Sequence, residues 1–259
     1  MMNSKSKKLD AFARLLDIID LLRNECPWDK KQTIESLRRL TIEEIYELSE
    51  SILKGDRNGI KEELGDVLLH IVFYSKIASE ENSFDIKDVI EKICEKLIYR
   101  HPHIFGKIKV NDENEVKRNW EALKLKKGKN NLLSGVPHSL PSLIKAQRIQ
   151  EKAAGVGFDW STEEEVWSKV EEELTELRIE IKEGNKNKIE EEFGDLFFSI
   201  INYARFLNID SDSALERTNQ KFTKRLSFIE NIAKKNGKSI NELTFKQLNK
   251  LWAEPKNHD

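Results

Sequence analysis

Four carboxylates with matched spacing are the residues best suited to chemistry in this sequence. Glu173 and Glu176 are three residues apart, and so are Glu192 and Asp195. Residues at this spacing share a helix face, and two antiparallel helices would bring the pairs face to face. Carboxylates that converge beside an apolar core repel one another unless a cation lies among them. Mg²⁺ is the usual oxygen-liganded ion where phosphates complete the shell, so we expect these residues to hold Mg²⁺.

The same pattern occurs a second time, 129 residues earlier. EELGDVLLHI at 62–71 matches EEFGDLFFSI at 191–200, and IEEIYEL matches VEEELTEL upstream. A solvated acidic face is the usual explanation of a single EExxE, but both motifs repeated at identical spacing favour a site. The repeat predicts a second set of metal ligands, made of Glu44, Glu47, Glu63 and Asp66.

Asp195 and Gly194 are weak helix formers in the middle of a predicted helix. A ligand site explains the aspartate, whereas a charged surface does not. Close packing of two helices is a second explanation for Gly194 and stays open.

Several cations near the acidic motifs would suit phosphate groups. Lys169 and Lys188 each precede a glutamate of the acidic set by one turn, and Lys221 and Arg225 are four apart on the next predicted helix. Each of them alone is more often an ordinary surface residue. Trp252 is likewise more often a core residue than a platform for a nucleobase.

Other motifs are weaker. His70 follows Asp66 at i+4, but the second copy has Ser199 at this position, so a satisfied or surface histidine is the better interpretation. RHPHIF at 100–105 is typical of a helix end and a turn. ExxH does not occur, which argues against a di-iron bundle, and there is no Walker loop, GxGxxG or GxSxG.

Helical periodicity runs through almost the whole chain, and no alternating stretch predicts a strand. Apolar residues from Ala11 to Leu22 line a first helix, which ends near CPWD at 26–29. GVGFDW at 155–160 interrupts the pattern. The sequence therefore predicts an all-α fold. Further helices are expected at about 33–54, 57–81, 86–101, 113–126, 142–153, 162–184, 187–208, 211–236 and 243–253.

The repeat predicts two tandem helical-bundle modules that arose by duplication. The N-terminal module covers residues 9–126 and the C-terminal module residues 142–254. Between them, 127–141 contains Gly, Asn and Pro and is expected to be a linker. Trp120 and Trp252 stand near the ends of the two copies.

Composition excludes some classes of protein. A formal net charge of −2 over 259 residues argues against binding of a nucleic-acid polymer through a broad basic surface. Cys26 and Cys94 are isolated, and no signal peptide or membrane-length run is present, so we expect a soluble cytoplasmic protein without membrane contact. The chain has more apolar side chains, Phe197 and Phe198 among them, than one small helical bundle can bury. This excess predicts a homodimer.

Together the motifs resemble the MazG family of nucleoside triphosphate pyrophosphohydrolases in its two-domain form. CPWDKKQT, ELGDVLLHIVFYSKIA, RHPHIFG, GFDW, EEFGDLFF and NQKFTKR carry the resemblance, over about residues 9–254. It implies an all-α homodimer that uses Mg²⁺ to hydrolyse NTPs and dNTPs to monophosphate and pyrophosphate. By position, it assigns Mg²⁺ to Glu173, Glu176, Glu192 and Asp195. It assigns nucleotide contacts to Lys169, Glu172, Lys188, Ile189, Glu190, Glu191, Lys221, Phe222, Arg225 and Trp252.

Hydrolysis between the α and β phosphates needs an in-line water and neutralised oxygens. Glu172 is the candidate catalytic residue that would orient the water. Lys188, Lys221 and Arg225 would steady the pyrophosphate.

The two copies differ in their cations. Leu40 and Gly59 stand where the second copy has Lys169 and Lys188, so we expect the C-terminal module to do most of the hydrolysis. Arg38 or Arg39 could compensate from a neighbouring turn. Two other interpretations stay open: an inorganic pyrophosphatase or narrower nucleotide hydrolase, and a helical regulator whose acidic faces bind a basic partner.

Overall fold

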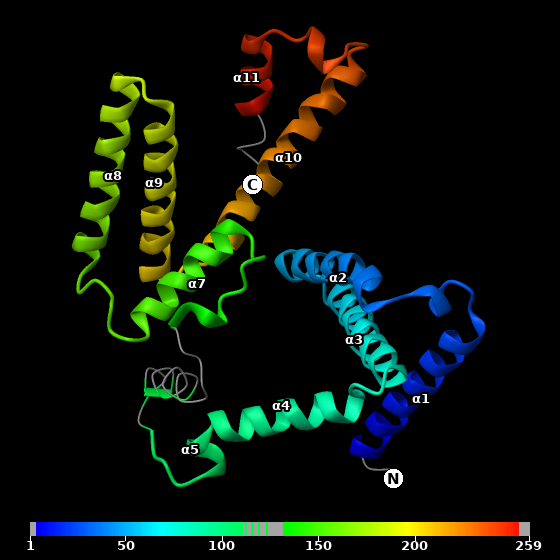
Figure 1. Cartoon of the computed structure of the whole chain (residues 1–259). Coiled ribbons are helices and arrows are strands. Elements are labelled where there is room, and N and C mark those ends of the chain that lie inside the picture. The colour runs from blue at the N-terminus through cyan, green and yellow to red at the C-terminus, as the bar shows by residue number, and fades with distance from the viewer. Residues whose placement is uncertain are drawn as a thin grey trace. The chain divides into compact units, whose positions relative to one another are not determined.

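A computed structural model describes residues 4–110, 112, 115, 116, 119, 123 and 132–253 (Figure 1). Every regular element among them is helical, which confirms the predicted all-α class. The chain divides into two compact units, Met1–Val110 and Asn111–Asp259. Most of the predicted helix at 113–126, Trp120 included, and residues 127–131 of the predicted linker lie outside the described residues.

The N-terminal unit is organised around a helical hairpin, α2 and α3. Its core joins Ile19 and Leu37 to Val72, Phe73 and Ile77 of α3, so α1 packs against the hairpin. The elements are α1 (Ser4–Glu25), η1 (Asp29–Lys31), α2 (Ile34–Lys54), α3 (Arg57–Glu80), α4 (Ile86–Arg100) and α5 (Pro102–Phe105).

The C-terminal unit repeats this plan with the hairpin of α8 and α9 (Figure 1). Val166, Val170 and Leu177 are buried on α8, and Ile201 is buried on α9. α7 and α10 pack against α9. The elements are η2 (Leu132–Gly135), α7 (Ser142–Ala154), α8 (Glu163–Glu183), α9 (Lys186–Phe206), α10 (Ser211–Lys235), η3 (Ile240–Glu242) and α11 (Phe245–Ala253).

Local sequence fixes where the arms of the second hairpin begin and end. α8 starts in a capping box, in which the Thr162 hydroxyl accepts from the Glu165 backbone N–H and the Glu165 carboxylate accepts from that of Thr162. Gly184 ends α8 with φ +77°, a conformation that favours glycine. The side chain of Asn185 then caps α9 by accepting from the N–H of Lys188.

The first hairpin turns with the same chemistry. Gly55 ends α2 with φ +68°, and Asp56 caps α3 by accepting from the N–H of Asn58. Gly55 and Gly184 are themselves 129 residues apart. The two hairpins therefore turn at equivalent positions, so that equivalent residues of their arms face each other. The predicted repeat is confirmed as a repeat of structure.

The described part of the predicted linker belongs to the C-terminal unit. η2 packs against α7, where Lys152 Nζ, a buried cation, donates to the carbonyl oxygen of Leu132 at 3.3 Å. The division at 110/111 also precedes the predicted module boundary. The exact extent of the two modules stays a prediction.

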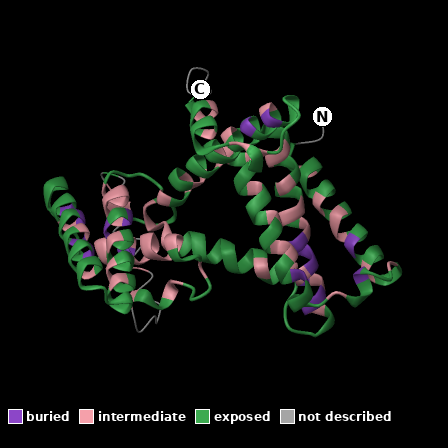
Figure 2. Cartoon of the chain, turned by 90° about the horizontal axis from the view of Figure 1, so that it is seen from above, coloured by how far each residue is buried: buried purple, intermediate pink, exposed green. Residues whose placement is uncertain are grey.

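A large share of the apolar side chains is exposed. Figure 2 shows few buried positions on the helices of either unit. On α9, the exposed fractions are 43% for Phe193, 60% for Phe197, 42% for Phe198 and 47% for Ile200. None of the helices in the described ranges is both long and apolar enough to cross a membrane. The predicted cytoplasmic location stays a prediction.

Candidate active site

Three carboxylates meet between the arms of the second hairpin, and we call them the C-terminal cluster: Glu173, Glu176 and Glu192. One oxygen of each lies within 4.8 Å of an oxygen of the other two. Glu173 is buried, Glu192 is half-buried and Glu176 is exposed. The hairpin therefore brings three of the four predicted ligands together. Asp195, the fourth, does not belong to this group.

Glu192 lies among like charges in this cluster. Burial raises the pKa of Glu192, and the charges of Glu176, Asp195, Glu173 and Glu180 raise it further. Asp195 thus lies near enough to act on Glu192 through its charge. In addition, Glu192 Oε2 is buried and has no hydrogen-bond partner in the described part of the chain. A buried acceptor without a donor, among like charges, suits a bound cation.

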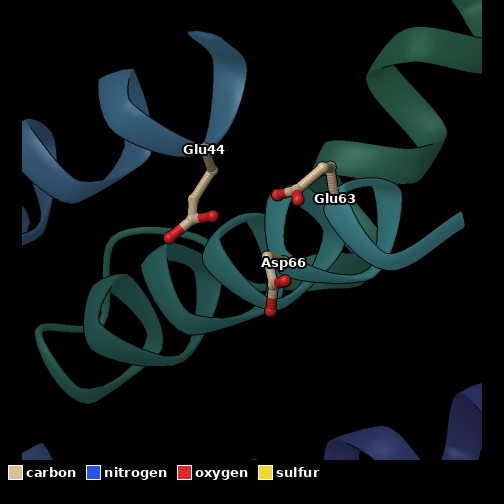
Figure 3. A group of neighbouring side chains, drawn as sticks. All are labelled: Glu44, Glu63 and Asp66. Atoms are coloured by element: carbon tan, nitrogen blue, oxygen red, sulfur yellow. The ribbon is translucent and has the colours of Figure 1, made fainter. Parts of the chain in front are cut away.

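The first hairpin carries an equivalent N-terminal cluster, made of Glu44, Glu63 and Asp66. Figure 3 shows Glu44 reaching from α2 toward Glu63 and Asp66 on α3, and the three offer oxygens within 4.8 Å of one another. All three are half-buried. Burial and then neighbouring carboxylates raise the pKa of Glu44 and of Glu63. Here Glu47 is the predicted ligand outside the group, so the two clusters differ in their third member.

The two lysines of the second hairpin are held by carboxylates. Lys169 Nζ lies 2.7 Å from Glu173 Oε1 and 2.9 Å from Glu172 Oε1. These bonds, first that to Glu173, raise the pKa of Lys169. Glu172, the predicted water-orienting residue, is exposed on α8 and touches this cation. Lys169 therefore lies at the edge of the cluster, in contact with one of its members.

Lys188 reveals a residue that the sequence analysis missed. Its Nζ donates to Glu180 Oε1 at 3.0 Å, from the first turn of α9 to the last turns of α8. Glu180 and Lys188 stand four residues before and four after Gly184. Residues equally far from Gly184 on the two arms of the hairpin lie opposite each other. This equal spacing could have predicted the pair of Glu180 and Lys188 from the sequence. The neighbours Ile189, Glu190 and Glu191 lie on the same turns of α9, the two glutamates exposed.

The remaining predicted nucleotide contacts gather on α10 and α11. The ring of Trp252 packs at 4.9 Å from that of Phe222, and the guanidinium of Arg225 lies 5.6 Å from the Trp252 ring centre. Lys221 is exposed beside them, and Trp252 is half-buried. These four residues form one patch. Figure 1 shows α10 carrying α11 away from the α8–α9 hairpin, so the patch and the C-terminal cluster lie on different parts of the unit.

His70 is a structural residue. It is buried, and its Nδ1 lies 2.7 Å from the hydroxyl of Thr41, which lies 2.6 Å from that of Tyr74. Burial lowers the pKa of His70. Of the two predicted alternatives, a hydrogen-bonded or a surface histidine, the structure shows the first.

Gly194 is not required by packing within the chain. A Cβ atom at Gly194, or at Gly65 in the first hairpin, would meet nothing within 4 Å in the described structure. Close packing between two helices of the same chain therefore does not explain either glycine.

The fold and the site define the class: an all-α protein with two copies of a helical hairpin, each with carboxylates clustered between its arms. The family model described as the MazG nucleotide pyrophosphohydrolase domain matches residues 32–105 and 161–242, once over each hairpin. The chain belongs to the MazG family, as its motifs predicted. It is accordingly an enzyme of the hydrolase class.

Two relatives match over almost the whole chain. The nucleoside triphosphate pyrophosphohydrolase/pyrophosphatase MazG of Thermotoga maritima is 44% identical, over 96% of this chain and 96% of its own. The nucleoside triphosphate pyrophosphohydrolase of Escherichia coli K12 is 38% identical, over 95% of this chain and 97% of its own. A crystal structure of a mazG-related protein from T. maritima aligns with 44% of this chain and 98% of its own, at 32% identity and a TM-score of 0.39, too low to support a comparison of folds.

Proposed function

We propose that the protein hydrolyses nucleoside triphosphates, both NTPs and dNTPs, to monophosphate and pyrophosphate in a Mg²⁺-dependent reaction, mainly in its C-terminal unit. The observation that carries the proposal is the C-terminal cluster with Lys169 beside it, on a hairpin that the family model matches. The names of the full-length relatives support the substrate class.

The residues present fit Mg²⁺. The C-terminal cluster offers three carboxylates from two helices, and oxygen is the donor that this ion prefers. Glu192 Oε2, buried without a donor, is the atom that gains most from a cation. Glu173, Glu176 and Glu192 would hold the ion, and Asp195, whose charge acts on Glu192, is the fourth ligand that we propose. When bound, Mg²⁺ supplies positive charge to the phosphate oxygens.

The other residues have roles that follow from their chemistry. Lys169 and Lys188 bind phosphate oxygens as point charges. Glu172 orients a water molecule in line with the α–β anhydride bond and takes up its proton as the new P–O bond forms. The bond to the bridging oxygen breaks and pyrophosphate leaves. The patch of Lys221, Phe222, Arg225 and Trp252, which lies apart from the C-terminal cluster, has cations suited to phosphate and an aromatic face suited to a base.

Product analysis tests the proposed reaction. We expect each NTP, incubated with the protein and Mg²⁺, to yield monophosphate and pyrophosphate in equal amounts, with no turnover after chelation of the metal. Orthophosphate released from added pyrophosphate would indicate a pyrophosphatase instead. No turnover of any nucleotide would contradict an enzyme of this kind and favour a partner-binding protein.

We also propose that the protein is a homodimer that covers the exposed face of α9. Phe193 and Phe197 are exposed there, and Gly194 between them leaves open space that a second copy can enter. Light scattering is expected to give about twice the chain mass of 30.2 kDa at micromolar concentrations. A mass that stays near that of one chain would contradict the proposal.

A further inference from the structure

One ion pair on the second hairpin lies outside the C-terminal cluster. Glu180 Oε1 accepts from Lys188 Nζ at 3.0 Å, and the side chains of Glu180 and Lys188 are 14% and 52% exposed. Burial fixes the position of the carboxylate, whereas the lysine would otherwise be a mobile surface side chain. The contact therefore determines where the ammonium group stands.

Glu180 belongs to the surroundings of the cluster without being one of its members. It lies one turn after Glu176 on α8, and its charge contributes to the raised pKa of Glu192. Its second oxygen, Oε2, is buried and has no hydrogen-bond partner among the described residues. Lys169 differs in this respect, because its partner Glu173 is itself a cluster member. A metal ion would compete with Lys169 for Glu173 but would leave the contact between Glu180 and Lys188 in place.

The first hairpin lacks both partners of this pair. Ser51 and Gly59 stand 129 residues before Glu180 and Lys188, and they flank Gly55 in the same way. A Cβ atom at Gly59 would lie 2.7 Å from Ser51 Oγ, so the two small residues already occupy the space between the arms. The N-terminal unit therefore has a carboxylate cluster but no lysine at the position that corresponds to Lys188.

We propose that Glu180 is a positioning residue of the C-terminal unit, which holds the ammonium group of Lys188, one helical turn before Glu192, for an oxygen of the triphosphate. The inference rests on the proposed function and deepens it, since it names the residue that prepares one phosphate contact. A lysine already restrained loses less rotamer freedom when the nucleotide binds. The ammonium group has three donors, so it can keep its hydrogen bond to Glu180 and donate a second one to the phosphate.

A double-mutant cycle in the full-length chain tests the proposal, with ATP at saturating Mg²⁺ and with α,β-methylene-ATP as a binding probe. Glu180→Ala is expected to raise the KM for ATP and the Kd for the analogue about tenfold while kcat changes by less than about threefold. Glu180→Gln, which keeps the acceptor oxygen, should lose less. The double variant Glu180→Ala/Lys188→Ala should have the same KM and Kd as Lys188→Ala alone, because Glu180 acts only through Lys188.

Glu183→Ala is the matched control. Glu183 is an exposed carboxylate at the end of α8 that acts on Lys188 through its charge, whereas Glu180 also accepts a hydrogen bond from it. Its removal should change the KM and the Kd by less than about twofold. Circular dichroism should show unchanged helix content in every variant.

Two results would overturn the proposal: an unchanged Kd in Glu180→Ala, or losses that multiply in the double variant. A wild-type protein that binds the analogue but releases no pyrophosphate from ATP would instead refute the proposed function. In that case, the Kd of each variant for the analogue, relative to that of the wild type, would still show whether Glu180 positions Lys188.

Discussion

Glu192→Gln is expected to reduce NTP hydrolysis by at least about a hundredfold, because it removes a charged ligand from between the arms of the hairpin. The same change should leave the metal-free protein as stable as the wild type, or more stable, because it removes repulsion within the C-terminal cluster. Pyrophosphate release from ATP measures the first effect. Thermal unfolding with and without Mg²⁺ measures the second, and the stabilisation by Mg²⁺ should shrink in the variant.

The pH dependence of the same variant has a definite sign. Since the folded state raises the pKa of Glu192, the folded chain holds this proton more tightly than the unfolded chain does. The contribution to stability is therefore fully present below the unfolded pKa and is lost as pH rises through the folded pKa. Without metal, the Tm of the wild type relative to Glu192→Gln should fall as pH rises above the ordinary value of 4.5.

Glu183→Gln serves as control for both measurements, because Glu183 is exposed on the same hairpin outside the cluster. It should retain wild-type hydrolysis and the full effect of Mg²⁺. The assignment fails if Glu192→Gln keeps more than about a tenth of the wild-type turnover, or if its Tm still rises with Mg²⁺ as far as that of the wild type.

The second large effect is a difference between the two units. Glu63→Gln should keep NTP turnover within about threefold of the wild type, whereas Glu192→Gln should lose it. Leu40, Ser51 and Gly59 replace Lys169, Glu180 and Lys188 in the first hairpin. Two missing charge-assisted contacts, at about 1.5–3 kcal/mol each, weaken triphosphate binding there even if the metal ligands remain.

The comparison uses the full-length chain at saturating Mg²⁺, with ATP turnover as the readout. Arg39, one of the two arginines that could compensate, is exposed and lies 3.8 Å from Glu43. Equal losses of ATP turnover in Glu63→Gln and Glu192→Gln would show that both units are needed for hydrolysis. This result would refute the predicted difference between the two units.

Periodicity and repetition were enough to predict the all-α fold and the hairpins. The helix face shared by Glu173 and Glu176, the break between the helices predicted at 162–184 and 187–208, and the match to Glu63 each follow from spacing along the chain. These are local properties of a hairpin. The cluster that they imply is present in both units.

Side-chain partners across the hairpin could not be predicted in the same way. The pairing of Lys169 with Glu173 depends on rotamers, and the sequence analysis treated that lysine as a cation for phosphate alone. Glu180 was missed for a different reason: its counterpart is Ser51, so a search for what the copies share passes over it. The place of Asp195 outside the group of three also depends on the direction of its side chain, which spacing does not give.

The tight turn at Gly184 has a consequence for how the protein is made. Glu173 and Glu192 are separated by only one helical hairpin, so their encounter requires the closure of a short loop rather than the assembly of the whole chain. The same holds for Glu44 and Glu63 around Gly55. During synthesis from the N-terminus, the first cluster can thus be complete before the second hairpin has left the ribosome. The carboxylates of each cluster come from one hairpin alone, so a change of cations in one hairpin leaves the carboxylate set of the other intact.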